Sequence, residues 1–416
     1  MSNTALTADI IAAEAIRILE NNCVMGNLVY RGYEEEFSKK VNGYTIGETL
    51  SVRRPTDFTV RDGATAAVQD VVEGKTTFTI DKQKGVDFKF TSSDLTLQID
   101  KLADRVIKPA MVQLANQIDR DCLALYKDVW NWVGTPTSTG PVIDTFADFA
   151  KGTERLDLSA VPQDERYAVL SPSDQWALLG SQTALYMQDV AKDAYRKGKL
   201  GMIANVETYS SQNVQTHTTG TRDNTTPLVK GANQSTTWAA SKDTGTMSLL
   251  TDGHDTVVTI KQGDVFTISG VYAVNPVTKA TLGYLQQFVV KADVTADATT
   301  TNTTTLTISP PIITSGAFQT VSAVPADDAT ITFVSSTASL AYSSNMIFHK
   351  NAFGLVMVPM VAPPGAVDVA RKSYNGYSVR VIPYYDGTND ISNWRLDVLY
   401  GVKTLDPRLA TRIVGT

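Results

Sequence analysis

The sequence has little of the residues that carry chemistry, with two cysteines and three histidines among 416 residues. Cys23 and Cys122 lie about a hundred positions apart, outside any CxxC pair, in segments of helical periodicity. We interpret both as buried, reduced thiols, with a disulfide or a metal role as the alternative. None of His217, His254 and His349 is spaced with Cys, Asp or Glu as metal ligands would be, so we interpret them as polar loop residues.

Signatures of cofactor binding are missing too. Neither GxGxxG nor GxxxxGKS/T occurs, so no phosphate-binding loop is predicted. Asp327, Asp328 and the acidic residues of 386–390 resemble fragments of a calcium loop, but the twelve-residue pattern with its closing Glu is absent and turns explain them better. The sequence therefore predicts no cofactor, no metal site and no catalytic residue, and we do not expect an enzyme.

The chain also lacks a basic charge excess and long apolar runs. Its net charge of −6 provides no field to hold nucleic acid by neutralising phosphates, so DNA is expected as a neighbour and not as a ligand. No apolar run approaches the roughly 20 residues that span a bilayer, and no basic region followed by an apolar stretch opens the chain. We expect a folded protein of two or three domains, made in a cytoplasm and without membrane contact.

The N-terminal segment has the periodicity of an amphipathic helix. Thr7 is a plausible N-cap, and the apolar face comprises Leu6, Ile10, Ile11, Ala15, Ile18 and Leu19. Because a helix of about ten to fourteen residues is marginal alone, we interpret 1–45 as an arm that docks elsewhere on the structure or on a partner. The run of glutamates at 34–36 beside Lys39 and Lys40 indicates a solvated face or an arm contact.

Alternating polar and apolar residues predict strands at 50–60 and 76–90. Residues 61–75 between them contain Gly, Ala and charges, which indicates a loose tip. Such a long hairpin would be unstable alone, so we expect it to lie on a neighbouring subunit. Arg53 and Arg54 could meet acidic residues of that neighbour, and a solvated edge that discourages aggregation is the alternative.

A long helix is predicted to begin at residues 91–94 and to extend to Tyr126. Possible N-caps at 91–94 precede an apolar stripe that runs from Leu95 to Leu125. Pro109 should kink this helix near Arg105 or bring a break before it. A length on the order of 50 Å suits a spine better than the core of a compact enzyme.

Shorter elements follow, and then the composition changes. A helix at 146–158 with Phe146, Phe149 and Leu156 inward, a strand at 166–170 and a helix from Pro172 predict an α+β block. From about residue 218 to 344, Thr-rich sequence predicts a small barrel or sandwich with strands at 257–260, 265–269, 287–290, 304–308 and 330–334. After this segment, strands predicted at 379–382 and 396–400 have the composition seen before residue 218. The Thr-rich β domain is therefore interpreted as an insertion.

This order of elements resembles the major capsid proteins of tailed phages, which have the α+β fold called HK-ninety-seven-like. The insertion narrows the resemblance to coat proteins of short-tailed enterobacterial phages, whose insertion domain is a small telokin-like β barrel. The most telling residues are 91–99, 198–209 and 395–402, with Pro407 beyond them.

The resemblance implies a major capsid protein that assembles into hexamers and pentamers of an icosahedral shell enclosing phage double-stranded DNA. The implied location is the virion capsid, assembled in the bacterial host cytoplasm, with scaffolding and portal proteins as partners. Its implied parts are an arm at 1–45, an extended β-hairpin loop at 46–92, a spine helix with peripheral domain at 93–197, an axial domain with returning peripheral strands at 198–217 and 345–416, and an inserted barrel at 218–344.

Candidate contacts between subunits are Arg53, Arg54, Asp62, Lys75, Lys82 and Lys84, with Pro109 as the spine kink. Some members of the wider fold crosslink a loop Lys to a neighbour, but we do not expect this from Lys75, Lys82 or Lys84. An encapsulin-like cellular compartment and a carbohydrate-binding tail or adhesin protein are the alternative functions. Trp238, Tyr272 and Tyr284 are too scattered to favour a sugar platform.

Overall fold

The computed structural model describes residues 8–33, 40–41, 44–45, 49–61, 63–66, 68–91, 103–136, 143–182, 201–221, 226–255, 257–297, 303–335, 337–363 and 369–414. The chain forms two compact units, and each is built from non-consecutive segments. Unit 1 consists of Met1–Ser51, Thr77–Leu123 and Phe353–Lys403. Unit 2 consists of Val52–Thr76, Ala124–Ala352 and Thr404–Thr416.

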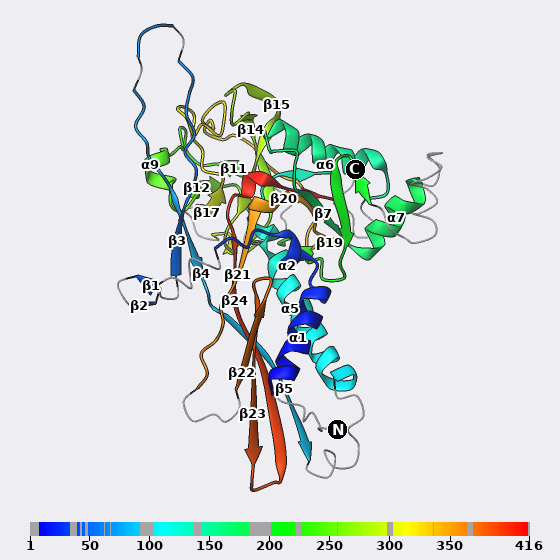
Figure 1. Cartoon of the computed structure of the whole chain (residues 1–416). Coiled ribbons are helices and arrows are strands. Elements are labelled where there is room, and N and C mark those ends of the chain that lie inside the picture. The colour runs from blue at the N-terminus through cyan, green and yellow to red at the C-terminus, as the bar shows by residue number, and fades with distance from the viewer. Residues whose placement is uncertain are drawn as a thin grey trace. The chain divides into compact units, whose positions relative to one another are not determined.

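Unit 1 is a sheet covered by helices. The strands run in the order β21-β24-β23-β22, and β5 lies along β24, from Lys82 opposite Tyr400 to Thr91 opposite Ile391. Helix α1 packs on β22, β23 and α5, as the dark blue and cyan helices of Figure 1 show. The elements are α1 (Ala8–Asn22), α2 (Met25–Leu28), a π-helical turn η1 (Ala103–Ile107), α5 (Lys108–Leu123), β1 (Lys40–Val41), β2 (Tyr44–Thr45), β5 (Lys82–Thr91), β21 (Phe353–Met357), β22 (Ala370–Tyr374), β23 (Tyr377–Asp386) and β24 (Ile391–Thr404).

The predicted N-terminal helix is confirmed, and it docks on its own chain. Ile11, Ala15 and Leu19 are buried, and Ile16 joins them. Ile10, expected on the same apolar face, is 46% exposed. The 3.6-residue period carries Ile10 away from the stripe that Ile11 and Ala15 define.

The prediction of one long hairpin is wrong in both strands, and the strand expected at 50–60 ends at Arg53. Strands β3 (Thr49–Arg53) and β4 (Lys75–Thr79) form a two-stranded sheet, and residues 54–74 between them belong to no strand in the described part. The expected strand at 76–90 is two strands, because the chain breaks at Ile80 and Asp81 and β5 then joins the sheet of unit 1. Alternation identifies a strand but not its partner, and the longer β24 offers ten paired positions.

Unit 2 contains a six-stranded mixed sheet in the order β6-β25-β20-β7-β9-β8. The predicted helix at 146–158 and strand at 166–170 are confirmed to the residue. Phe149 and Leu156 are buried, whereas Phe146, the first helical residue, is 45% exposed and corrects our prediction. The elements are η2 (Ala124–Asp128), β6 (Trp132–Val133), α6 (Phe146–Leu158), β7 (Arg166–Leu170), α7 (Pro172–Gln182), β8 (Met202–Ile203), β9 (Val206–Ser210), β20 (Asn345–His349), η3 (Lys350–Ala352), η4 (Pro407–Leu409) and β25 (Ala410–Ile413).

A second six-stranded sheet of unit 2 closes on itself. Its order is β11-β12-β17-β15-β14-β18, and a bridge between Leu228 and Thr330 joins the two ends. Inside lies an apolar core that includes Phe266, Phe288 and Leu306. We call this closed sheet, together with helix α9 and the separate two-stranded sheet of β13 and β16, the barrel. Its elements are β11 (Leu228–Val229), α9 (Trp238–Ser241), β12 (Met247–Asp252), β13 (Thr259–Ile260), β14 (Val265–Val274), β15 (Thr281–Val290), β16 (Val294–Thr295), β17 (Thr304–Ser309) and β18 (Ile331–Phe333).

The chain enters and leaves the barrel through two paired strands. β10 (Thr216–Thr218) and β19 (Ala341–Ser343) are antiparallel, with His217 opposite Tyr342. β9 precedes this pair and β20 follows it, and both belong to the other sheet of unit 2. The composition change near residue 216 and the return near 345 coincide with these strands.

Candidate assembly surfaces

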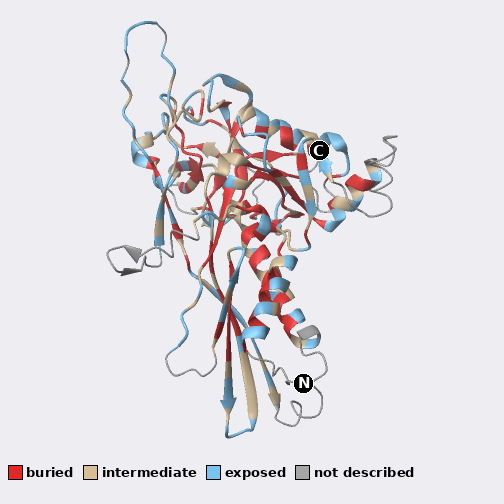
Figure 2. Cartoon of the chain, in the orientation of Figure 1, coloured by how far each residue is buried: buried red, intermediate tan, exposed pale blue. Residues whose placement is uncertain are grey.

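The loop 54–74 exposes apolar side chains to solvent. Val60 is 98% and Val68 is 94% exposed, and Phe58 and Val71 are also exposed. Figure 2 shows the loop coloured almost throughout as exposed or intermediate. Exposed apolar groups of this kind mark interaction surfaces. The sequence interpretation placed Phe58 and Val60 in a strand and Val68 and Val71 in a loose tip, and it did not single out any of the four as a contact.

The loop is braced along its length. Arg54 donates its backbone N–H to the Gly74 carbonyl at 2.8 Å and its Nε to Thr76 Oγ1 at 2.6 Å. Further out, the Gln69 side-chain amide accepts from the Thr59 N–H at 2.9 Å and donates to the Thr59 carbonyl at 2.6 Å. These contacts join the two arms of the loop beyond the end of the β3–β4 ladder.

Ionic contacts add to this bracing. Arg53 pairs with Glu73 at 2.9 Å, and Arg408 of η4 pairs with Asp57 at 3.1 Å. Burial lowers the pKa of Arg54 from its ordinary value, which agrees with a guanidinium packed inside the loop base. Arg54 therefore contacts residues of its own subunit, whereas the Arg53 side chain is 82% exposed and accessible to a neighbour.

The other candidates from the sequence are scattered over the two units. Lys75 is exposed and donates its backbone N–H to Asp243 Oδ1 at 3.1 Å. Lys82 pairs with Asp121 of α5 at 3.1 Å, while Lys84 on the same strand is exposed. Asp62 lies outside the described residues, as do the N-cap candidate Thr7, the glutamates at 34–36, and most of the helix start at 91–99.

Pro109 is exposed and is the second residue of α5, directly after the π-helical turn η1. Proline has no backbone N–H, so it cannot donate to a carbonyl of the preceding turn. Wide π turns of this kind interrupt a regular helix.

A buried carboxylate holds the start of the chain to α5. Asp119 accepts the backbone N–H of Val24 at 2.7 Å and that of Gly26 at 3.0 Å, at the beginning of α2. Burial raises the pKa of Asp119 from 3.8 to about 6. On the same helix, Asp121 accepts from Tyr400 Oη at 2.8 Å.

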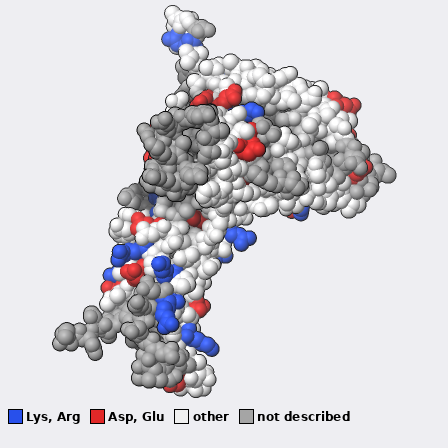
Figure 3. Space-filling model, turned by 90° about the vertical axis from the view of Figure 1, so that its right-hand side faces the viewer, with Lys and Arg blue, Asp and Glu red and all other residues white. Residues whose placement is uncertain are grey.

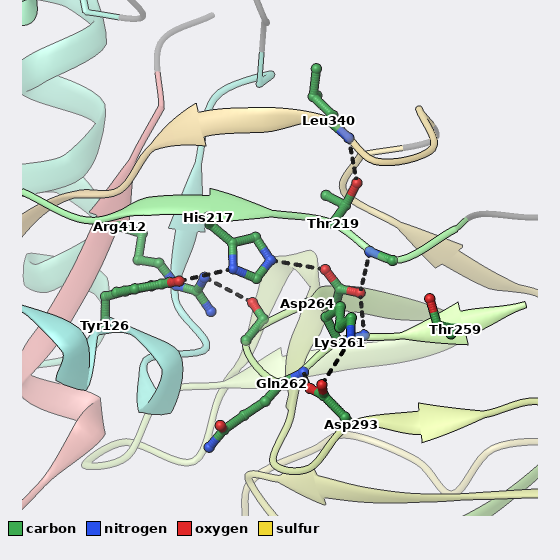
Figure 4. A network of polar contacts seen from close by, with 12 residues as sticks. Tyr126, His217, Thr219, Thr259, Lys261, Gln262, Asp264, Asp293, Leu340 and Arg412 are labelled. Carbon is green, nitrogen blue, oxygen red and sulfur yellow. Dashed lines mark hydrogen bonds and ion pairs between the residues drawn. The ribbon is translucent and has the colours of Figure 1, made fainter.

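A polar network lies in the interior of unit 2, where the connecting strands meet the barrel (Figure 4). His217 stands between Tyr126 Oη, 3.0 Å from Nδ1, and Asp264 Oδ1, 2.9 Å from Nε2. Burial raises the pKa of Tyr126 to about 12, so its hydroxyl keeps a proton to donate. A neutral imidazole with its proton on Nε2 satisfies both contacts, and we assign that tautomer.

Arg412 of β25 completes the network and is fully buried. It donates to the Val129 carbonyl at 2.9 and 2.6 Å and to the Gly263 carbonyl at 2.8 Å. Burial lowers its pKa from the ordinary value. The end of η2, the barrel turn and the C-terminal strand are thereby joined through one side chain.

All three histidines are buried, and two of them, His217 and His349, lie in strands and correct our interpretation of them as loop residues. His217 lies in β10 and His349 ends β20, while His254 follows β12 and contacts Thr251 Oγ1 at 3.0 Å. The expectation of buried, free cysteines is confirmed for Cys23 and Cys122. Burial raises the pKa of both thiols, which keeps them protonated.

Within the described ranges no group of three His, Cys, Asp or Glu residues could hold a metal ion. No helix of the described part is long and apolar enough to cross a membrane. On the face in Figure 3, Lys and Arg side chains lie among Asp and Glu and form no single basic field. The exposed apolar residues of the loop 54–74 are of the kind that marks a protein which associates with other chains.

Comparisons with known proteins identify the family. A family model described as P22 coat protein, gene protein 5, matches residues 1–415. The chain is 21% identical over 394 residues to a major capsid protein of Acyrthosiphon pisum secondary endosymbiont phage 1, covering 91% of each. A structure of Mycobacterium phage Che8 is similar, with a TM-score of 0.50, 14% identity and coverage of 95% of this chain and 92% of that one. The chain belongs to the P22 coat protein family and is a phage major capsid protein.

Proposed function

We propose that this capsid protein builds an icosahedral shell of hexamers and pentamers, and that the loop 54–74 meets a neighbouring copy. The exposure of Val60 and Val68 on a braced loop is the observation that carries this proposal. Burial of each such side chain against a neighbour would stabilise the contact between the two subunits by roughly 1.5–3 kcal/mol. Contacts of that size are weak singly, but a closed shell multiplies them because each subunit is held by several others.

We further propose the domain organisation of the HK-ninety-seven-like fold for this chain. In this proposal the arm is 1–45, the extended loop lies within 46–92, and η1, α5 and η2 belong to the spine within 93–197. The axial domain with returning strands comprises 198–217 and 345–416, and the barrel is the inserted domain at 218–344. The pairing of β10 with β19 and the closure of the barrel support the insertion.

The candidate contact residues divide by exposure. Arg53, Lys75 and Lys84 are exposed and are proposed to meet a neighbour. Arg54 and Lys82 hold Thr76 and Asp121 of their own subunit and are proposed to position the strands that carry the contacts. Asp62 remains a candidate from the sequence alone.

We also propose scaffolding and portal proteins as partners, assembly in the bacterial host cytoplasm, and enclosure of double-stranded DNA without sequence-specific binding. The net charge of −6 supports the last point, because an acidic container does not grip DNA. The proposal includes no enzymatic activity, and membership of a coat protein family does not favour the encapsulin-like or adhesin alternatives.

The loop contact is tested with Val60→Ser combined with Val68→Ser. Both side chains are more than nine-tenths exposed, so the variant subunit is expected to unfold at the wild-type denaturant midpoint. It should nevertheless yield at least tenfold fewer closed shells by electron microscopy and sedimentation. Val277→Ser, 72% exposed on the barrel, is the matched control and should assemble normally. Normal shell yield from the double variant would refute the loop as a contact surface.

A further inference from the structure

The base of the extended loop is held by the barrel of the same subunit. In Figure 1, α9 lies beside the two blue strands from which the loop rises. Trp238 of α9 donates its indole Nε1–H to the Val72 carbonyl at 2.8 Å. Asp243, in the turn after α9, accepts the Lys75 backbone N–H at 3.1 Å. Two side chains of the barrel thus satisfy main-chain groups on the returning arm of the loop.

The indole is itself held in a fixed orientation. Its ring is stacked on Phe318 of the barrel, with ring centroids 3.7 Å apart and planes 5° from parallel. Loop and barrel also approach closely at Gly74. A Cβ at this position would lie 2.4 Å from the Lys242 carbonyl and 3.2 Å from Trp238 Cζ2. The contact between the loop and the barrel therefore requires a glycine at position 74 on the loop and a planar hydrogen-bond donor at position 238 on the barrel.

Beyond this base, Arg408 of η4 contacts the loop at Asp57, 3.1 Å away, through side chains that are 37% and 28% exposed, so solvent weakens this pair. The backbone pairing of its two arms ends with the contact between Arg54 and Gly74, and Gln69 then bridges to Thr59. About ten extended residues reach roughly 30 Å at 3.3 Å each, so a rotation of about 10° at the base moves the tip by about 5 Å. A displacement of that size exceeds the tolerance of a packed apolar contact.

We infer that Trp238 and Asp243 are positioning residues through which the barrel sets the direction in which the loop 54–74 is presented to a neighbouring copy. This inference rests on the proposed function of the loop and adds that the barrel acts within its own subunit. The barrel then contributes to assembly without itself contacting the neighbour at this point.

The test uses the full chain and two readouts, of which the first does not require assembly. In unassembled subunits, the rate of tryptic cleavage after Arg61 reports the mobility of the loop. Trp238→Phe keeps the stack on Phe318 but removes the donor, and Asp243→Ala removes an exposed acceptor. Each is expected to raise the cleavage rate at least threefold while the denaturant midpoint stays within error of wild type. Shell yield or size uniformity should fall in parallel.

Matched controls separate loss of the anchor from general damage. Trp176→Phe alters a tryptophan that is 61% exposed on α7. Gly283→Ala adds a Cβ into open space on the barrel, whereas Gly74→Ala places one against the Lys242 carbonyl. Only Gly74→Ala should behave like Trp238→Phe. If Trp238→Phe does not fold, Asp243→Ala decides alone.

Wild-type cleavage rates in both anchor variants would overturn the inference, and so would a mobile loop that still assembles into normal shells. Failure of the proposed function has a different signature. In that case the variant with serine at positions 60 and 68 assembles normally, whatever the cleavage rates of the anchor variants.

Discussion

Asp264 Oδ1 lies 2.9 Å from His217 Nε2, and the two side chains are 0% and 3% exposed. The second oxygen of Asp264 accepts the Lys261 backbone N–H at 2.9 Å. An interior carboxylate is thus compensated by an imidazole from a connecting strand and by a turn of the barrel. The pair joins the barrel to the strand through which the chain enters it.

We predict that His217→Ala lowers the free energy of unfolding by about 3 kcal/mol, because it leaves a buried carboxylate without its imidazole donor. Denaturant unfolding followed by tryptophan fluorescence measures this. Lys261→Ala is the control, since Lys261 pairs with Asp293 across an exposed surface at 2.9 Å. The Lys261→Ala variant should lose less than about 1 kcal/mol of unfolding free energy. Equal losses in the two variants would contradict the structural role of the buried pair.

The second prediction concerns pH. The pKa of Asp119 is raised from 3.8 to about 6, because burial disfavours its charged form. A raised folded-state pKa contributes stability that is present below about pH 4 and is lost as the pH rises through about 6. Relative to Asp119→Asn, the wild type should therefore gain about 2 kcal/mol between pH 7 and pH 4.

The Asp119 measurement is urea unfolding of both proteins at pH 4, 5, 6 and 7. The amide of the variant cannot accept with both of its terminal atoms, so a constant loss is expected at every pH. The difference between the two proteins cancels other titrating groups. Parallel curves across this window would show that Asp119 is not the titrating group.

The third prediction contrasts two arginines that share Asp397 in unit 1. Arg380 contacts its Oδ2 at 2.6 Å with a side chain 10% exposed, whereas Arg395, at 2.8 Å, is 44% exposed. Arg380→Ala should cost about 3 kcal/mol of unfolding free energy. Arg395→Ala should cost less than about 1 kcal/mol, since solvent screens the pair. Thermal unfolding of both variants decides, and the reverse order would refute the burial argument.

The fourth prediction concerns Pro109. Pro109→Ala restores a backbone N–H directly after η1, which should favour a regular α-helix there. If this junction lets one sequence fit both hexamers and pentamers, the variant should give shells of altered size distribution. Electron microscopy of assembled particles measures it. Shells of unchanged size, yield and expansion behaviour would count against a role for the junction.

Local signals predicted two elements to the residue. The helix Phe146–Leu158 begins after Thr145, whose side chain accepts from the Asp148 N–H in a capping box. The strand Arg166–Leu170 has a short apolar run bounded by polar turns. In both cases the determining interactions lie within a few positions, so the sequence pattern contains them.

Long-range partners could not be predicted in this way. Strand β5 pairs with β24, about three hundred positions later, and no alternation pattern encodes that choice. His217, Asp264 and Arg412 come from three distant segments, so only the folded chain brings them together. The same holds for Trp238, whose partner Val72 precedes it by 166 positions.

The antiparallel pair β10 and β19 places Thr216 opposite Ser343. Paired strands lie about 5 Å apart, so the chain enters and leaves the barrel at one place, the β10–β19 pair. A domain that is connected through one pair of neighbouring strands can be replaced by another domain, by recombination in nature or by grafting in the laboratory, when the termini of the replacement also lie close together. A graft confined to residues after 218 and before 341 would keep both connecting strands, including His217, but would remove Asp264, Trp238 and Asp243. A foreign domain would therefore have to supply new partners for His217 and for the base of the loop before the subunit could carry it into a shell.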